Sequence, residues 1–164
     1  MNDDDVIAKR VAELAGLLES RGLHVSTAES CTGGWLAKCL TDLPGSSDYF
    51  DRGWVTYSNA AKQELLGVPG RLLLRQGAVS AAAALAMLRG TLRASRATVA
   101  IAVTGIAGPA GATPGKPVGT VWIAWGRRSR GRLRLTTREY RFRGDRDAIR
   151  RRSVAAALRG LLRP

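Results

Sequence analysis

Residues Leu23–Gly34 read LHVSTAESCTGG, an apolar stretch that runs into a carboxylate, hydroxyls, a thiol and a pair of glycines. The first eight residues favour a β-strand, and CTGGWLAKCLTDL, which begins at Cys31, favours a helix. A strand that passes directly into a helix is typical of α/β proteins. The stretch therefore predicts an α/β fold whose polar side chains lie at the carboxyl edge of the sheet, where open α/β sheets bind ligands.

The rest of the chain alternates between helical and strand-like patterns on both sides of this stretch. Helical spacing of apolar residues covers 4–21, 60–68, 81–95 and 146–162. Strand-like patterns cover 49–58, 97–105, 120–126 and 132–144, the last two joined as a hairpin. Asn59, Ser80 and Asp145 precede predicted helices and can cap them. About five strands with helices before, between and after them predict a three-layer α/β/α sandwich with a mixed sheet, in a single domain over residues 1–164.

The charge of the chain is strongly basic and unevenly distributed. The net charge is +13, and 14 of the 22 arginines fall within residues 127–163. A basic tail of this kind is one mark of nucleic-acid binding, but its aromatic residues, Tyr140 and Phe142, show no stacking pattern. We interpret the tail as a solvated arginine-rich face and expect no nucleic-acid partner, with nucleic-acid binding as the alternative.

The bulk properties indicate a cytoplasmic protein. No apolar run is long enough to span a bilayer, and the N-terminus MNDDDVIAKR is acidic and lacks the apolar region of a signal peptide. Cys31 and Cys39 lie in a segment without other features of a disulfide scaffold, so we expect free thiols. We expect no membrane partner.

The residue inventory narrows the catalytic chemistry. The one histidine, His24, enters its strand at the end away from Ser30, which does not suit a Ser-His-Asp triad. Histidine, cysteine and acidic residues do not recur at metal-ligand spacing, so no metal site is expected. A hydroxyl nucleophile would then need a lysine as its base. The chain has only four lysines, and since arginine serves equally well for solubility, each is a candidate for a role that needs an amine.

Three stretches could together form a site. Ser30 lies at a strand-to-helix turn, where its hydroxyl is either exposed to a ligand or acts as a helix cap. Tyr57 follows the strand at 49–58 and Lys62 lies one turn into the next helix, so both can reach the same sheet edge as Ser30. A partly desolvated lysine can have a lowered pKa and accept a proton from serine. The alternative is that Tyr57 belongs to the core and Lys62 to the solvated surface.

The third stretch is the glycine- and proline-rich segment TGIAGPAGATPGKPVGT at Thr104–Thr120. It fails the G-x-x-x-x-G-K-[ST] test for a Walker loop, since Ala110 and Pro117 occupy required positions, and a strand follows it instead of a helix. Its glycines leave backbone N–H groups open to a phosphate or carboxylate. A rigid Pro-Gly connection is the alternative.

Taken together, these stretches resemble the CinA C-terminal domain family, whose stand-alone members act as nicotinamide-nucleotide amidases. The resemblance runs from about Val6 to Leu162 and is carried by TAESCTGG, FDRGWVTYSNAAKQELLGV, GAVS, AVTGIAGPAGATPGKPVGTVWIAW and FRGDRDAIRRRSVAAAL. It implies hydrolysis of the carboxamide of nicotinamide mononucleotide without a metal or other cofactor, in a homo-oligomer. It also implies a serine nucleophile helped by a lysine, matched here by Ser30, Lys62 and Tyr57. The glycine-rich signature of the family falls on Thr104, Gly105, Gly108 and Pro109.

The resemblance supports a mechanistic hypothesis with two open points. Ser30 attacks the carboxamide carbon while Lys62, directly or through Tyr57, accepts the serine proton. Backbone N–H groups around Cys31–Gly34, which include those of Thr32 and Gly33, stabilise the oxyanion, and the Thr104–Pro109 loop with Arg146 holds the phosphate. Glu29 either orients Lys62 or meets the pyridinium charge.

Two alternatives to this mechanism remain. Cys31 is the rival nucleophile, although side chains of neighbouring strand residues point to opposite faces, so Cys31 is expected to pack behind Ser30. The rival function is a non-catalytic protein of the CinA type, linked to competence or DNA damage, that binds a nucleotide or nucleic acid.

Overall fold

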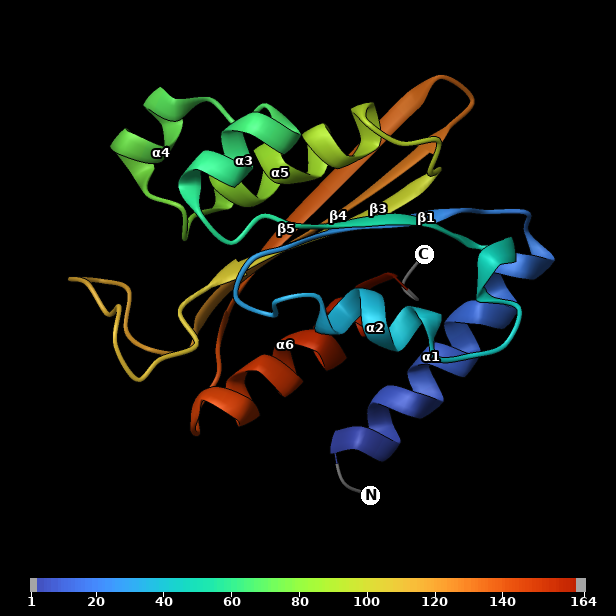
Figure 1. The fold of residues 1–164 in the computed structure, drawn as a ribbon, viewed down its shortest axis with the longest axis horizontal. Coiled ribbons are helices and arrows are strands. Elements are labelled where there is room, and N and C mark those ends of the chain that lie inside the picture. The colour runs from blue at the N-terminus through green and yellow to red at the C-terminus, as the bar shows by residue number, and fades with distance from the viewer. Residues whose placement is uncertain (1–2, 162–164) are drawn as a thin grey trace.

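The computed structural model describes residues 3–161. A mixed five-stranded sheet lies between two layers of helices (Figure 1), which confirms the predicted three-layer α/β/α arrangement. The strands are β1 (Val25–Glu29), β2 (Phe50–Val55), β3 (Val99–Gly105), β4 (Thr120–Ser129) and β5 (Arg132–Arg141).

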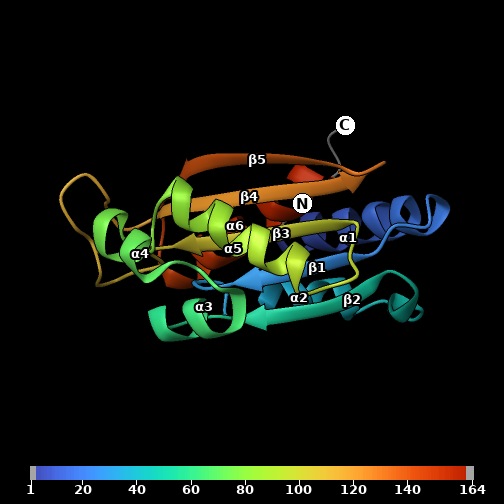
Figure 2. The same ribbon diagram turned by 90° about the horizontal axis from the view of Figure 1, so that it is seen from above.

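The strand order explains why one edge of the sheet collects functional residues. The order is β2-β1-β3-β4-β5, as the view in Figure 2 shows. β1 is parallel to both β2 and β3, whereas β4 runs antiparallel to β3 and pairs with β5 in the predicted hairpin. The carboxyl ends of β1, β2 and β3 therefore meet at one edge, and β4 begins there.

The first helical layer consists of α3 (Asn59–Leu66), α4 (Gly70–Gln76) and α5 (Ala81–Arg93). α5 lies across the sheet and buries an apolar stripe that includes Met87 and Leu88. Gly90 lets α3 approach closely, since a Cβ at this position would lie 2.2 Å from the carbonyl oxygen of Leu66. The close packing of α3 against α5 therefore fixes the position of α3 over the ends of β1 and β2.

The second layer consists of α1 (Asp3–Ser20), α2 (Trp35–Thr41) and α6 (Arg146–Leu161), and a short 3-10 helix at Ser46–Asp48 leads into β2. These helices bury the second core cluster, which includes Leu14 and Leu18 of α1 and Val154 and Leu158 of α6. Within residues 3–161 no helix combines the length and apolarity needed to cross a membrane.

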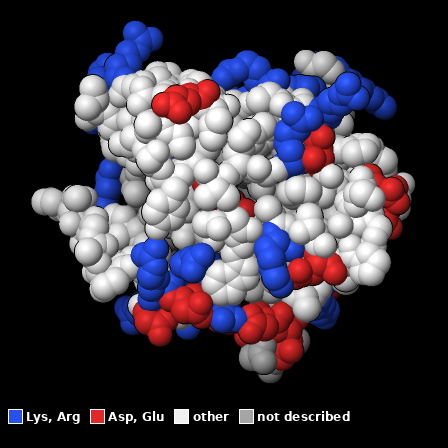
Figure 3. All heavy atoms as spheres, viewed as in Figure 1, with Lys and Arg blue, Asp and Glu red and all other residues white. Residues whose placement is uncertain are grey.

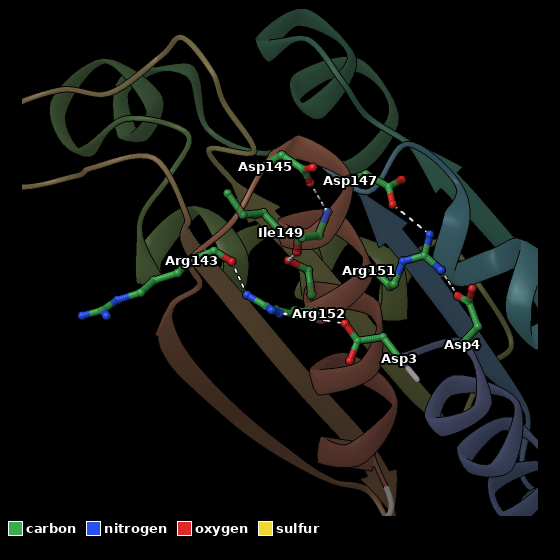
Figure 4. Close-up of polar contacts among 10 residues, drawn as sticks. Asp3, Asp4, Arg143, Asp145, Asp147, Ile149, Arg151 and Arg152 are labelled. Carbon is green, nitrogen blue, oxygen red and sulfur yellow. Dashed lines mark hydrogen bonds and ion pairs between the residues drawn. The ribbon is translucent and has the colours of Figure 1, made fainter. Parts of the chain in front are cut away.

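Ionic contacts fasten the beginning of α6 to α1 (Figure 4). Arg151 pairs with Asp4 of α1 and, at 2.8 Å, with Asp147 one turn earlier in α6. Arg152 lies 3.9 Å from the carboxylate of Asp3. The amide of Ala148 donates to the Asp145 carboxylate at 2.8 Å, so the predicted cap is present. α6 is thus held in place at its first turns as well as through its apolar face.

Several features differ from the sequence prediction. The helix expected from Cys31 begins only at Trp35, because the glycines before it adopt positive φ angles of 60° and 95° and form a turn. Ser58, rather than Asn59, caps α3 by accepting the Ala61 amide at 3.0 Å. α4 was not predicted, and the expected end of α6 at Leu162 lies outside the described residues. The Ser80 cap of α5 is confirmed.

Candidate active site

The three parallel strands bring the predicted residues to one edge. Ser30 follows β1 directly, Tyr57 follows β2, Lys62 lies in the first half of α3, and Thr104 is the penultimate residue of β3. The expectation that Ser30 and Lys62 reach the same place is confirmed, since the Nζ of Lys62 lies 3.1 Å from the Oγ of Ser30.

The surroundings of the Lys62 amine define its orientation. Nζ donates to the main-chain carbonyl of Thr56 at 2.7 Å and to that of Tyr57 at 3.4 Å. Carbonyl oxygens can only accept hydrogen bonds, whereas a serine hydroxyl can donate or accept. A neutral amine that satisfies both carbonyls with its two N–H groups therefore directs its lone pair at Ser30, which is the geometry of a base for this hydroxyl.

Burial favours the neutral form of the Lys62 amine. The Lys62 side chain is 1% exposed, and none of the ion pairs formed within residues 3–161 includes it. Desolvation lowers the pKa of Lys62 below that of a free lysine. Lys62 is therefore a buried side chain, in contrast to the alternative of a solvated surface lysine, and its lowered pKa favours the neutral amine that a general base needs.

Cys31, the rival nucleophile, lies in a different environment from Ser30. Its side chain packs in the core cluster between the sheet and α1, α2 and α6, and it also reaches the cavity wall. Burial raises the pKa of the Cys31 thiol to about 12. A thiol acts as a nucleophile in its thiolate form, so this environment disfavours attack by Cys31.

Tyr57 and Arg146 meet at the rim of the site. The Tyr57 phenol is 57% exposed and accepts a hydrogen bond from Nη2 of Arg146 at 2.8 Å, while Nη1 of Arg146 donates to the Gly108 carbonyl at 2.6 Å. The phenol does not lie between Ser30 and Lys62, which contact each other directly. The structure thus corrects the option of a relay through the Tyr57 side chain, and Tyr57 orients Lys62 only through its main-chain carbonyl.

Glu29 has a different role from either of those expected. Its carboxylate is fully buried and accepts the amides of Gly34 at 3.1 Å, Leu36 at 3.0 Å and Ala37 at 2.8 Å. These are the unpaired N–H groups at the beginning of α2. Glu29 therefore caps α2, and neither orients Lys62 nor faces a ligand.

The turn between Ser30 and α2 keeps two donors open. The amide of Gly33 donates to the Ser30 carbonyl at 3.0 Å, and that of Trp35 to the Thr32 carbonyl at 3.2 Å. The expected set of oxyanion donors is therefore too large, because the Gly33 and Gly34 amides are used within the protein. In the described part of the chain, the amide of Thr32 donates to no protein acceptor, and the amide of Cys31 contacts only its own thiol.

A cavity of about 260 Å³ opens beside Ser30 and Lys62. Of the predicted site residues, its wall includes Ser30, Cys31, Tyr57, Lys62, Thr104, Gly105, Gly108 and Arg146. Residues of the prediction that do not line it are Glu29, Thr32, Gly33, Gly34 and Pro109. The side chain of Thr104 is also turned away from an incoming ligand, since its hydroxyl donates to the Ala78 carbonyl at 2.8 Å.

Several residues of the cavity wall were not among the predicted site residues. These are Asn59, Ala78, Val79, Ile106, Ala107, Ala110 and Gly111. Two of them, Ala78 and Val79, lie in the GAVS segment, Gly77–Ser80, which is one of the segments that carry the family resemblance. Apart from the helix cap Ser80, this segment has no chemically reactive side chain. Its contribution to the wall depends on α5 packing over β3, which local sequence does not reveal.

Basic side chains also gather in other parts of the surface. Figure 3 shows Lys and Arg interleaved with Asp and Glu along the α1 and α6 side of the molecule, and a basic group near the β4–β5 hairpin. The hairpin turn lies at the opposite end of β4 from the cavity. Several arginines of α6 bind protein groups, among them Arg146, Arg150 and Arg151. The tail is therefore partly structural instead of simply solvated.

Comparison with known proteins agrees with this arrangement. The sequence model described as the CinA C-terminal domain matches residues 7–164. The chain belongs to this family. Pseudomonas putida has a relative named nicotinamide-nucleotide amidohydrolase PncC, 50% identical over 96% of this chain and 96% of its own. An Escherichia coli K12 protein of the same name is 49% identical over 98% of this chain and 95% of its own.

Solved structures of the family share the fold. The competence/damage inducible protein CihA from Agrobacterium tumefaciens superimposes with a TM-score of 0.92 at 44% identity, over 96% of this chain and 94% of that chain. The family membership expected from the motifs is thereby confirmed for nearly the full length of the chain.

Proposed function

We propose that this protein is a nicotinamide-nucleotide amidohydrolase that converts nicotinamide mononucleotide and water to nicotinate mononucleotide and ammonia, with Ser30 as nucleophile and Lys62 as its base. The names of the full-length relatives support the activity. The contact of 3.1 Å between Ser30 and a buried lysine oriented by two main-chain carbonyls is the observation that supports the mechanism.

The first half of the reaction forms an acyl-enzyme. The Oγ of Ser30 attacks the carboxamide carbon as Lys62 accepts the hydroxyl proton, which gives a tetrahedral oxyanion. When the C–N bond breaks, the Lys62 ammonium returns its proton to the nitrogen, and ammonia leaves. A nicotinoyl ester of Ser30 remains.

The second half uses the same groups with water. Neutral Lys62 accepts a proton from a water molecule that attacks the ester carbon. The resulting intermediate breaks the bond to the Ser30 oxygen, which recovers its proton from Lys62, and nicotinate mononucleotide leaves. One lysine thus acts alternately as base and acid, so the cycle balances without a histidine.

The open amides of Cys31 and Thr32 are the donors that we assign to the oxyanion. They follow the nucleophile directly, as the oxyanion-binding amide does in other hydrolases with a nucleophile at a strand-to-helix turn. Removal of one such donor typically lowers kcat by about 100- to 1000-fold. This assignment replaces the larger donor set expected from the sequence.

We assign the phosphate to Arg146 and the Gly108 segment of the loop. A guanidinium has five N–H groups, and the two bonds of Arg146 to Tyr57 and Gly108 leave others for a phosphate. The cavity of about 260 Å³ is small for a nucleotide, which suits a substrate whose pyridine ring enters while its phosphate stays at the rim.

The experiment that tests the proposal measures ammonia release from the mononucleotide, the riboside and free nicotinamide. Ser30→Ala and Lys62→Met are each expected to lower kcat by at least about 100-fold. Lys38→Met is the matched control, because Lys38 is exposed on α2 and pairs only with Asp42. A Ser30→Ala protein that retains wild-type turnover would refute the mechanism.

We further propose that the chain acts as one domain in a cytoplasmic homo-oligomer. Exposed apolar side chains at Val55, Leu65 and Leu74 support self-association, since they belong to neighbouring surface elements on the β2 and α3–α4 side. Light scattering after size-exclusion chromatography tests the oligomeric state, and a monomer at all concentrations would contradict it.

A further inference from the structure

Arg150 of α6 reaches the turn that follows Ser30, from 119 residues away in the sequence. Its Nε donates to the Cys31 carbonyl at 3.2 Å, and its Nη2 donates to the Thr32 carbonyl at 3.0 Å. One guanidinium thus binds two consecutive carbonyls of this turn. Neither carbonyl belongs to a helix or strand, so these bonds do not continue regular secondary structure.

The guanidinium is itself held in place. It lies over the ring of Trp35, the first residue of α2, with 5.4 Å from its carbon to the ring centroid. Gly33 has a φ of 60°, and a Cβ at this position would lie 3.3 Å from Nη2 of Arg150. The glycine therefore provides both the turn conformation and the space for the arginine.

The two carbonyls matter because of the amides to which they are coupled. In a trans peptide the C=O and N–H are fixed in one plane and point in opposite directions. The bond from Arg150 to the Cys31 carbonyl therefore fixes the direction of the Thr32 amide. The preceding peptide is fixed in the same way, because the Ser30 carbonyl accepts the Gly33 amide and thereby orients the amide of Cys31.

We propose that Arg150 is a positioning residue that aims and polarises the Thr32 amide, one of the two donors that we assign to the oxyanion. The inference rests on the proposed function and extends it to a residue that does not line the cavity. A cation at the carbonyl strengthens the donor at the other end of the peptide, since linked hydrogen bonds polarise one another. Arg150 acts on the transition state through the backbone without touching the substrate.

α6 has several contacts besides those of Arg150. The helix is capped by Asp145, paired with α1 through Arg151, and packed on the sheet through Val154 and Leu158. Removal of the Arg150 guanidinium should therefore leave the fold in place and loosen mainly the turn. This separation makes the role testable.

The test compares Arg150→Met and Arg150→Lys with Arg151→Met. Arg151 is a matched control, since it lies over the same Trp35 ring at 5.0 Å but pairs with acidic residues instead of the turn. Arg150→Met is expected to lower kcat for the mononucleotide by about 10- to 100-fold with KM changed less than about 3-fold. Added guanidinium ion should restore part of the loss. Arg151→Met should lower thermal stability and leave kcat unchanged.

The pH profile separates positioning from proton transfer. The midpoint of the kcat profile, which we assign to Lys62, should stay unchanged in Arg150→Met, because the arginine does not contact the lysine. Arg150→Lys should also lose activity, because a single ammonium cannot bind both carbonyls in the fixed geometry of the fork.

Three outcomes would overturn the inference. The first is unchanged kcat in Arg150→Met. The second is an equal loss of kcat in Arg151→Met. The third is a KM increase confined to the mononucleotide and absent for the riboside, which would make Arg150 a phosphate contact. If Arg150→Met does not fold, the kcat and the pH profile of Arg150→Lys decide the question. Loss of activity in Ser30→Ala together with full activity in Arg150→Met would refute only this inference, whereas activity in Ser30→Ala would refute the proposed function.

Discussion

Replacing Glu29 by glutamine tests the finding that this carboxylate caps α2. Its two oxygens accept three amides, from Gly34, Leu36 and Ala37. Glutamine has nearly the same shape but only one oxygen, which can serve Gly34 and Leu36 together. The side-chain NH2 of the glutamine then faces the Ala37 N–H, so two hydrogen-bond donors face each other without an acceptor.

The loss of stability follows from these contacts. A hydrogen bond to a charged group contributes about 1.5–3 kcal/mol, and one between neutral groups about 0.5–1.5 kcal/mol. Two bonds that change from charged to neutral therefore cost about 1 kcal/mol each, and the bond lost at Ala37 costs about 1.5–3 kcal/mol. The total is about 3–5 kcal/mol, which for a chain of this length lowers Tm by about 10 °C.

Differential scanning calorimetry and urea unfolding measure this change, with Glu64→Gln as the control because Glu64 is exposed on α3. The control should stay within about 0.5 kcal/mol of the wild type. At temperatures where Glu29→Gln is folded, kcat should fall more than KM rises, since the turn that carries Ser30 loses its support. Unchanged Tm with a large increase in KM would refute the cap and make Glu29 a substrate contact.

Three further predictions concern the cavity. For Lys62, kcat/KM should rise with pH through its lowered pKa, because the neutral amine is the base. The unfolding free energy of Lys62→Met relative to wild type should decrease as pH rises toward the pKa of an unfolded lysine, where the cost of burying the ammonium disappears; a pH-independent difference measured in urea would contradict this. For Cys31, with a pKa of about 12, alkylation by iodoacetamide at pH 8 should be at least about 100-fold slower than for free cysteine, as followed by mass spectrometry; rapid inactivation that substrate prevents would restore Cys31 as the nucleophile. Arg146→Met should raise KM for the mononucleotide by about 10-fold or more and leave KM for the riboside nearly unchanged, consistent with loss of a charge-assisted phosphate contact; equal effects on both substrates would contradict the assignment.

Much of the fold could be predicted because local patterns and tertiary structure agree. The continuous apolar run at 97–105 can only be accommodated in the centre of a sheet, and β3 is buried from Val99 to Thr104. Ser80 precedes a long alanine-rich segment and caps α5 as expected. The beginning of α2 was misplaced because periodicity extends across Gly33 and Gly34, whereas their positive φ angles exclude them from the helix.

The candidate site was predictable at the level of its reactive side chains. The scarcity of histidine indicated a lysine as the base, the family resemblance and the positions at the strand ends indicated Ser30 and Lys62, and the structure places these two side chains in contact. The roles of Glu29 and Arg150 were not predictable, because each acts on the backbone of a segment whose turn geometry appears only in three dimensions. Glu29 is adjacent to Ser30 in sequence, yet its side chain turns toward α2 and away from the cavity.

The two carbonyls that orient Lys62 belong to the main chain of Thr56 and Tyr57, so no substitution of a side chain removes them. In the proposed mechanism, the groups that transfer the proton are thereby separate from the side chains at the rim, to which we assign the outer part of the substrate. A substitution of Tyr57 would change the side chain at the rim without removing the main-chain carbonyls that accept from Lys62. A scaffold of this kind can acquire new amide substrates without rebuilding its base.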